Sequence, residues 1–341
     1  MSDRAAVQPP CPWHREHTGE LLQQYRAQRL AHALLFAGPA GTGKRRFARA
    51  LVEALLCEQP TGGLACGRCR GCHLAVAGSH PDLFLLEPEE AGKAIPVDRI
   101  RELVDFASRT PQFGGARLAL LHPAEAMLHP AQNALLKTLE EPGPDMILVL
   151  VSHRPASLLP TIRSRCRQHV FPIPDPEPAR QWLEEELGES GGEVQALLAA
   201  AGGAPLRARE LAETPWFQRR RELLQALVRV AESPRAVPEA ARLCAEMKLD
   251  AVVLVEAAWG WTARALRQLA GVPAGRHQDT VLAPLLARLA EVAGEERLLA
   301  FSRQLLRARR MLASGSNPNA ELLREQLLLA LAGVDASPAD I

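Results

Sequence analysis

Residues Gly38 to Arg45 read GPAGTGKR, which fits a phosphate-binding loop at every position except the last. In the pattern G-x-x-x-x-G-K-[ST], glycines such as Gly38, Gly41 and Gly43 let several backbone N–H groups point at one phosphate. Lys44 would neutralise the β and γ oxygens. The final hydroxyl of the pattern ligates Mg²⁺, and Arg45 replaces it with a cation that cannot coordinate a metal. The loop therefore keeps the parts that bind phosphate and lacks a part that hydrolysis requires.

The residues on either side suit such a loop. The apolar run at 32–37 predicts a buried strand, and residues 46–56 carry apolar side chains at helical spacing. An eight-residue pattern can recur by chance. Strand, loop and helix in the expected order argue against coincidence here.

Length and composition limit the remaining possibilities. A chain of 341 residues should form about two or three domains, each able to bury a core. The net charge of +1 gives no general reason to expect nucleic-acid or membrane binding. No apolar run reaches the roughly 18–20 residues of a membrane span, and the first residues lack the pattern of a secretory signal. We therefore expect a cytoplasmic protein without membrane partners.

Four of the seven cysteines, Cys57, Cys66, Cys69 and Cys72, are spaced C-x8-C-x2-C-x2-C. In a cytosolic protein, clustered cysteines more often hold a metal than form disulfides. The short spacings let thiolates converge at the Zn–S distance of about 2.3 Å. We expect a structural Zn²⁺, because four thiolates leave no open position for water activation. Free thiols in a loop and an iron–sulfur cluster are the alternatives.

After the cysteines, strands alternate with helices. Apolar runs at 81–87, 116–121 and 146–152 predict strands, and residues 97–109 and 130–139 have the spacing of amphipathic helices. This alternation is typical of a parallel sheet with helices on both faces.

The residues after the run at 116–121 lack the acids of an active NTPase. Such an enzyme needs carboxylates there to hold Mg²⁺ and to polarise water. This chain has His122 and Pro123 instead. Glu125 or Asp82 could substitute from elsewhere, and that alternative stays open. Because the hydroxyl and the acids are both missing, we expect no Mg²⁺-dependent ATP hydrolysis by this chain.

Two further strings carry a family resemblance. NALLKTLEEP at 133–142 and TIRSRC at 161–166 resemble the clamp-loader branch of the AAA+ superfamily. The resemblance is strong from about residue 13 to residue 174 and weaker through GGAP at 202–205 and the closing segment at 317–331. Relatives that act as motors carry Asp-Glu at the position of His122-Pro123, which agrees with a loss of hydrolysis.

The resemblance implies an α/β AAA+ fold followed by helical domains. A RecA-like, P-loop NTPase-like domain with a parallel sheet and flanking helices is expected at 1–174, with an inserted zinc module at 57–72. A small helical lid domain at 175–212 and an all-α collar, or oligomerisation, domain at 213–334 would follow. The prolines within 172–178 predict a stiff linker, because repeated prolines disfavour helix.

The resemblance also implies a role in DNA replication. Clamp-loader subunits form an open ring that places the sliding clamp on primed DNA, and an arginine of one subunit reaches the γ-phosphate held by the next. Arg165, which follows Ser164 in TIRSRC, occupies that position, and its planar cation suits a transferring phosphoryl group. We expect a non-hydrolysing stator that supplies this arginine finger in trans. The implied partners are clamp-loader ATPase subunits and a delta subunit in a hetero-pentamer and, indirectly, the clamp and primer–template DNA.

Other positions are assigned by the same resemblance. Ser152 corresponds to the first sensor of the family, or only caps a turn, and Arg207 corresponds to the second sensor, or only begins a helix. Arg163 and Arg167 are DNA-facing or simply solvated. Lys44 and the loop amides allow ATP or ADP to bind without turnover, but we expect weak or no functional ATP binding.

Two other functions remain to be weighed. An ATP-hydrolysing clamp-loader motor would need a hydroxyl at position 45 and acids at 122 and 123. A stand-alone zinc-dependent DNA-binding protein would need a basic recognition helix beside the cysteines, where only Arg68 and Arg70 are found.

Overall fold

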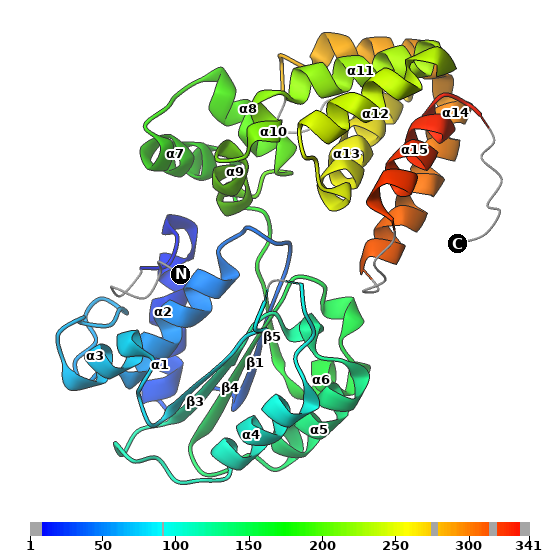
Figure 1. Cartoon of the computed structure of the whole chain (residues 1–341). Coiled ribbons are helices and arrows are strands. Elements are labelled where there is room, and N and C mark those ends of the chain that lie inside the picture. The colour runs from blue at the N-terminus through cyan, green and yellow to red at the C-terminus, as the bar shows by residue number, and fades with distance from the viewer. Residues whose placement is uncertain (1–8, 91, 274–278, 314–318, 335–341) are drawn as a thin grey trace. The chain divides into compact units, whose positions relative to one another are not determined.

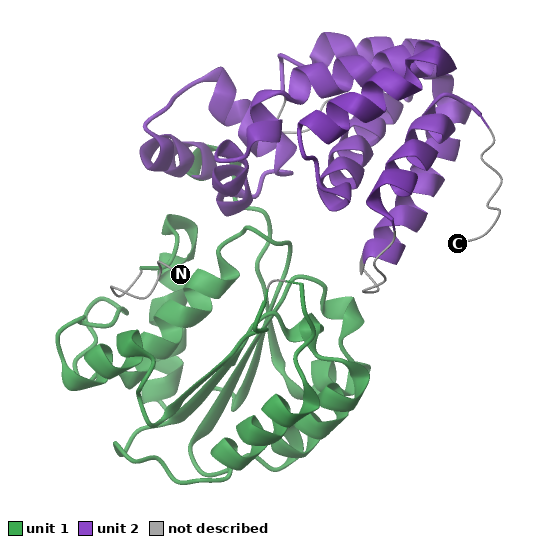
Figure 2. Ribbon diagram, viewed as in Figure 1, with its two compact units in different colours: residues 1–178 green, residues 179–341 purple. Residues whose placement is uncertain are grey.

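The computed structural model of the chain describes residues 9–90, 92–273, 279–313 and 319–334 (Figure 1). The chain divides into two compact units, residues 1–178 and 179–341 (Figure 2). None of the described helices combines the length and the apolar character needed to cross a bilayer.

Unit 1 is built on a parallel sheet of five strands in the order β2-β3-β4-β1-β5. The strands are β1 (Ala33–Ala37), β2 (Leu83–Leu86), β3 (Arg117–Leu121), β4 (Met146–Ser152) and β5 (Arg167–Val170). Every residue of β1, β3 and β4 is buried, which explains why these strands read as continuous apolar runs.

Helices cover both faces of the sheet (Figure 1). The α-helices among its described residues are α1 (Arg15–Arg26), α2 (Lys44–Leu56), α3 (Arg70–Ala77), α4 (Val97–Ala107), α5 (His129–Glu140) and α6 (Pro160–Arg165). Along β1 the side chains alternate: Leu34 and Phe36 enter a core with α1 and α2, whereas Leu35 enters a second core with α4, α5 and α6.

The predicted α/β class with a parallel sheet and flanking helices is confirmed. The run predicted at 146–152 is β4, and the helix expected from residue 46 begins at Lys44. The sequence did not reveal α1, α3, α6 or β5. β5 is the polar string RQHV at the edge of the sheet, half solvated, so it lacks the apolar signal of the central strands.

The stiff linker predicted at 172–178 is wrong in its second half. Helix α7 (Pro176–Leu187) begins inside it. Pro176 and Pro178 fall in the first turn, where the missing N–H groups would have no partner within the helix. The extended segment is therefore limited to residues 171–175.

Unit 2 is helical throughout its described residues. After α7 come α8 (Gly192–Ala200), α9 (Pro205–Ala212), α10 (Pro215–Gln218), α11 (Arg220–Glu232), α12 (Val237–Glu246), α13 (Ala251–Leu269), α14 (Ala283–Ala313) and α15 (Ala320–Leu331). Helices α11 to α15 share one core, which contains Trp261 and has Trp259 packed against it.

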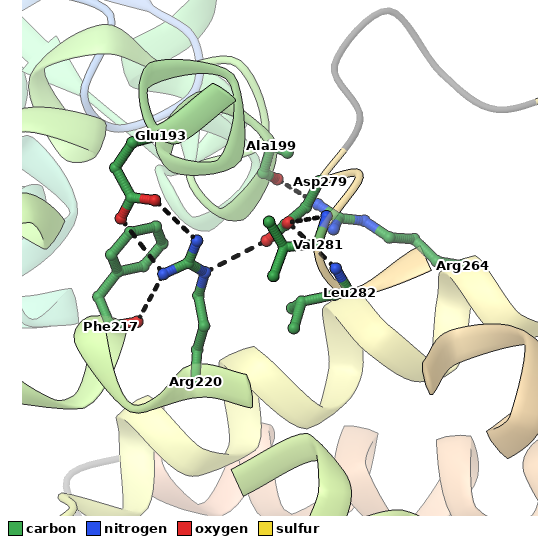
Figure 3. Close-up of polar contacts among 8 residues, drawn as sticks. All are labelled: Glu193, Ala199, Phe217, Arg220, Arg264, Asp279, Val281 and Leu282. Atoms are coloured by element: carbon green, nitrogen blue, oxygen red, sulfur yellow. Dashed lines mark hydrogen bonds and ion pairs between the residues drawn. The ribbon is translucent and has the colours of Figure 1, made fainter. Parts of the chain in front are cut away.

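A group of charges, with Arg220 and Asp279 buried and Glu193 half-buried, joins α8 to α11 and to the segment before α14 (Figure 3). Arg220 Nε lies 3.3 Å from Asp279 Oδ2, and its NH2 group lies 3.2 Å from Glu193 Oε2. Asp279 Oδ1 also accepts from the N–H groups of Val281 and Leu282. Breaking a buried pair such as Arg220–Asp279 usually costs about 3–5 kcal/mol, so α11 and the segment before α14 are held together firmly. The separate lid at 175–212 and collar at 213–334 stay a prediction.

Candidate functional site

The phosphate loop joins the carboxyl end of β1 to the start of α2, and its glycines are required by packing. Gly41 and Gly43 have φ of 76° and 94°, in the region that favours glycine. A Cβ at Gly38 would lie 2.1 Å from the carbonyl oxygen of Phe171, and one at Gly43 would lie 2.7 Å from Cys11 Sγ. The close neighbours alone demand glycine at positions 38 and 43, with or without a nucleotide.

Lys44 is folded back onto its own loop. Its side chain is buried, and Nζ donates to the carbonyl oxygen of Pro39 at 2.5 Å and to Thr42 Oγ1 at 3.5 Å. Burial lowers the pKa of Lys44 to about 8, against the opposing effect of Glu125. The lysine that would hold phosphate therefore already has acceptors within the chain.

Arg45, at the position of the Mg²⁺-binding hydroxyl, forms a two-pronged ion pair with Glu87. Its Nε lies 2.9 Å from Oε1 and its NH2 lies 2.8 Å from Oε2. Glu87 directly follows β2, so Arg45 points toward the carboxyl end of another strand. This arrangement places a paired cation where an NTPase needs a metal ligand.

His122 follows β3 and pairs with a second histidine instead of a metal. The Nε2 atoms of His122 and His153 lie 3.2 Å apart. Burial first, and then the positive charges of His153, Arg45 and Lys44, together lower the pKa of His122 to about 3. A neutral imidazole at this position cannot supply the negative oxygen that holds Mg²⁺ in an active site.

The two candidate substitute acids have other roles. Asp82 directly precedes β2, so it lies at the amino ends of the strands, whereas the loop lies at their carboxyl ends. Its carboxylate accepts from the N–H groups of Gln112 and Phe113 at 2.8 and 2.9 Å. That position rules out a role for Asp82 at the loop. Glu125 lies nearer, but both of its oxygens accept from the backbone N–H of His153, at 2.9 and 3.2 Å.

The predicted sensor residues are engaged locally. Ser152 Oγ accepts from the N–H of Arg154 at 3.2 Å, which caps the turn after β4. Arg207 lies in unit 2, where its NH2 group is 3.9 Å from Glu256 Oε2. Both sensor roles stay predictions.

Sequence reasoning missed an N-terminal segment that holds the loop. Trp13 Nε1 and His14 Nε2 both donate to the carbonyl oxygen of Thr42, at 3.0 and 2.9 Å. The buried His14 ring also packs edge-on against Phe47 and Phe171. The only available signal was the Trp-His pair within a polar stretch.

Arg165 lies at the other end of the sheet from the loop. It ends α6, directly before β5. β5 runs parallel to β1, with Arg167 opposite Leu34 and Val170 opposite Ala37. The loop follows Ala37, and Arg165 precedes Arg167, which lies opposite Leu34. The rise from Leu34 to Ala37 is about 10 Å, so the loop and Arg165 are separated by at least that distance along the sheet.

The side chains around Arg165 are partly exposed and bind nearby groups. Arg165 NH2 lies 2.6 Å from Glu140 Oε1, and its NH1 donates to the carbonyl oxygen of Thr161 at 3.2 Å. Ser164 Oγ donates to the same carbonyl at 3.1 Å. Arg163 is half-buried and Arg167 is exposed. DNA contact by Arg163 or Arg167 stays a prediction.

The four clustered cysteines meet at one point, between the end of α2 and the start of α3. The sulfur atoms of Cys57, Cys66, Cys69 and Cys72 all lie within 4.8 Å of one another. Cys69 and Cys72 are 3.4 Å apart, and each lies 3.9 Å from one of the other two sulfurs. Four sulfurs at 2.3 Å from a tetrahedral metal would be about 3.8 Å apart, so the thiols fit a structural metal site.

Backbone contacts prepare the cluster. The N–H groups of Cys66 and Cys72 donate to the sulfurs of Cys57 and Cys69, at 3.2 and 3.4 Å. Backbone hydrogen bonding, first at Arg68, lowers the pKa of Cys66 to about 6, whereas burial raises that of Cys57. The adjoining α3 reads RGCHLAVA, with Arg70 as its one Lys or Arg. It is not the basic recognition helix of a zinc-dependent DNA-binding protein.

Comparison with known proteins decides the family. Residues 13–175 match the model described as DNA polymerase III, delta subunit, and residues 214–333 match that of its C-terminal part. The chain is 39% identical over 325 residues to DNA polymerase III subunit delta' of Pseudomonas aeruginosa, covering 95% of this chain and 97% of the relative. The chain belongs to the DNA polymerase III delta prime subunit family.

A second relative supports the same assignment. The delta' subunit of Escherichia coli is 35% identical over 322 residues, with 94% of each chain covered. Because the match extends through both units, this family applies to the whole chain. The resemblance to the clamp-loader branch of the AAA+ superfamily is confirmed, and the chain is a component of DNA polymerase III.

We predict that His14 makes the fold sensitive to acid. Burial lowers its pKa from 6.5 to about 4, so between these values the unfolded chain takes up a proton that the folded chain excludes. The contribution of His14 is therefore present above pH 6.5 and falls by up to about 3 kcal/mol as the pH approaches 4. In H14Q the free energy of unfolding, measured in urea, should decline less over this range. The exposed His129 gives the control, since H129Q should keep the full decline. Equal declines for H14Q and the parent chain would contradict the prediction.

Proposed function

We propose that this chain is a non-hydrolysing, stator subunit of a clamp-loader complex that places a sliding clamp on primed DNA. In this role it supplies Arg165 as an arginine finger to ATP held by a neighbouring ATPase subunit. The expected assembly is a hetero-pentamer with ATPase subunits and a delta subunit.

The observation that carries the proposal is the separation of Arg165 from the phosphate loop of the same chain. The loop follows the carboxyl end of β1, and Arg165 precedes the amino end of the neighbouring β5. An arginine finger must contact the transferring phosphoryl group directly. Arg165 is too far from its own loop to do so, so a phosphate that it serves belongs to another chain.

The loop itself supports the absence of hydrolysis. Arg45, at the position of the Mg²⁺-binding hydroxyl, is paired with Glu87. Burial keeps the imidazole of His122 uncharged. An active motor subunit, the alternative function, needs metal ligands at both positions. Lys44 keeps its bonds to Pro39 and Thr42, so any ATP or ADP that binds must displace them.

Zn²⁺ is the metal we propose for the cysteine cluster. Four thiolates at tetrahedral spacing are typical of structural zinc and leave no position for catalysis. The metal would stabilise the loop between α2 and α3. Apart from the isolated β-bridge between Thr61 and Leu64, this loop has little regular secondary structure. Cys57, Cys66, Cys69 and Cys72 would be the ligands.

Metal analysis of the purified chain should find about one zinc per chain. C69S should lose most of it, because three thiolates bind the ion more weakly. C244A is the control, since Cys244 is buried in the core of unit 2 and should leave the zinc content unchanged. Iron with inorganic sulfide, or no metal with four reactive thiols, would overturn the zinc assignment.

Replacement of Arg165 tests the finger. In a complex of R165A with partner ATPase subunits, clamp and primed DNA, hydrolysis at the site that Arg165 serves should fall by about 10³-fold or more, and clamp loading should fall with it. R101A is the control, because Arg101 is an exposed arginine of α4 that pairs with Asp98 of the same helix. Normal hydrolysis and loading by R165A would count decisively against action in trans.

The chain alone provides the second arm of the test. We expect no steady-state ATP turnover from it, because metal ligands are lacking at positions 45 and 122. Turnover by the isolated chain that K44A abolishes would contradict the stator assignment and favour the motor alternative.

A further inference from the structure

Arg165 and Glu140 end two helices that are fixed against each other. Gln132, buried within α5, accepts from the N–H of Leu159 at 2.8 Å and donates to the carbonyl oxygen of Met127 at 3.0 Å. Leu159 is the N-cap of α6, directly before its first residue, and Ile162 of α6 is fully buried in the core shared with α5. Leu139 and Cys166, the chain neighbours of Glu140 and Arg165, are buried in the same core, which sets the backbone positions of both helix ends.

The contact between the two side chains leaves the guanidinium accessible. Glu140 binds NH2 of Arg165 through Oε1 at 2.6 Å, and Thr161 accepts from NH1 at 3.2 Å. The side chain of Arg165 remains 37% exposed. A guanidinium carries five N–H donors, so one carboxylate oxygen and one carbonyl oxygen do not use its whole donor capacity.

The contact is also weak enough to coexist with a stronger partner. Exposed ion pairs contribute little to stability, because water screens them and two long side chains must be ordered. A triphosphate carries more negative charge than one carboxylate, so Glu140 does not compete strongly with it for Arg165. What the pair does supply is order, since a free arginine samples many rotamers and loses that freedom when it binds.

We infer that Glu140 is a positioning residue for Arg165, holding the guanidinium in one place at the end of α6 so that it is ready to meet a phosphate of the neighbouring subunit. This inference rests on the proposed function, because it assigns Glu140 a role through Arg165. The carboxylate prepares the arginine and does not itself touch the nucleotide.

The test uses E140Q in the assembled complex, with single-turnover ATP hydrolysis as the readout. Gln keeps the size and a weak acceptor but loses the charge. We expect the hydrolysis rate to fall about threefold to tenfold, with the ATP concentration for half-maximal rate unchanged. E140D, which keeps the charge on a shorter side chain, should recover part of the rate. E141Q is the control, because Glu141 is the exposed neighbour just beyond α5; it should behave as the parent.

A double-mutant cycle separates positioning from a merely structural role. If Glu140 acts through Arg165, E140Q should cause no further loss in the R165A background. A normal rate for E140Q beside a slow R165A would overturn the inference and leave the proposed function standing. A faster rate for E140Q would also overturn it, because the carboxylate would then restrain the arginine. A normal rate for R165A would remove the proposed function, and the inference with it.

Discussion

The parallel direction of the five strands is the constraint on which the account of this chain depends. Because β1 and β5 are parallel, the segment that follows β1 lies at the carboxyl ends of the strands. The segment that precedes β5 lies at their amino ends, on the opposite side of the sheet. The first segment is the phosphate loop, and the second ends in Arg165. One chain thus presents a nucleotide-type loop and an arginine that cannot meet each other. In the proposed ring of subunits, that separation would let the arginine of one chain serve the loop of the next.

Packing explains how a phosphate loop can persist without its metal ligand. Gly38 and Gly43 have no room for a side chain, because Phe171 and Cys11 approach them closely. Lys44 is buried with acceptors in its own loop, and Trp13 and His14 hold the carbonyl oxygen of Thr42. Changes at these positions would disturb the fold even if nucleotide never bound. Arg45 is different, since it lies outside this packing and its exposed pair with Glu87 contributes at most about 1 kcal/mol. Position 45, where the pattern has its metal-binding hydroxyl, is therefore freer to change than the glycines and Lys44.

The sequence revealed those parts of the fold whose signals are local. The buried strands β1, β3 and β4 are continuous apolar runs, and the four cysteines have metal-binding spacing. β5 was missed because an edge strand does not need apolar residues on both faces. The contact between His14 and Thr42, and that between Arg165 and Glu140, join residues more than 20 positions apart, and no local periodicity encodes such pairs. The linker predicted at 172–178 was too long because proline is unfavourable in the interior of a helix but favourable in its first turn, where α7 has its prolines. The family resemblance added what local patterns could not, namely an expected role for the TIRSRC string.

The central claim is that the chemistry of this chain is directed at a neighbour's nucleotide. The most direct test is an experimental structure of the assembled clamp loader with a non-hydrolysable ATP analogue and primed DNA. We expect the guanidinium of Arg165 to lie about 3 Å from a γ-phosphate oxygen bound by the adjacent ATPase subunit, within hydrogen-bonding range. It is contradicted if that phosphate is contacted by another arginine while Arg165 keeps only Glu140 and Thr161 as partners.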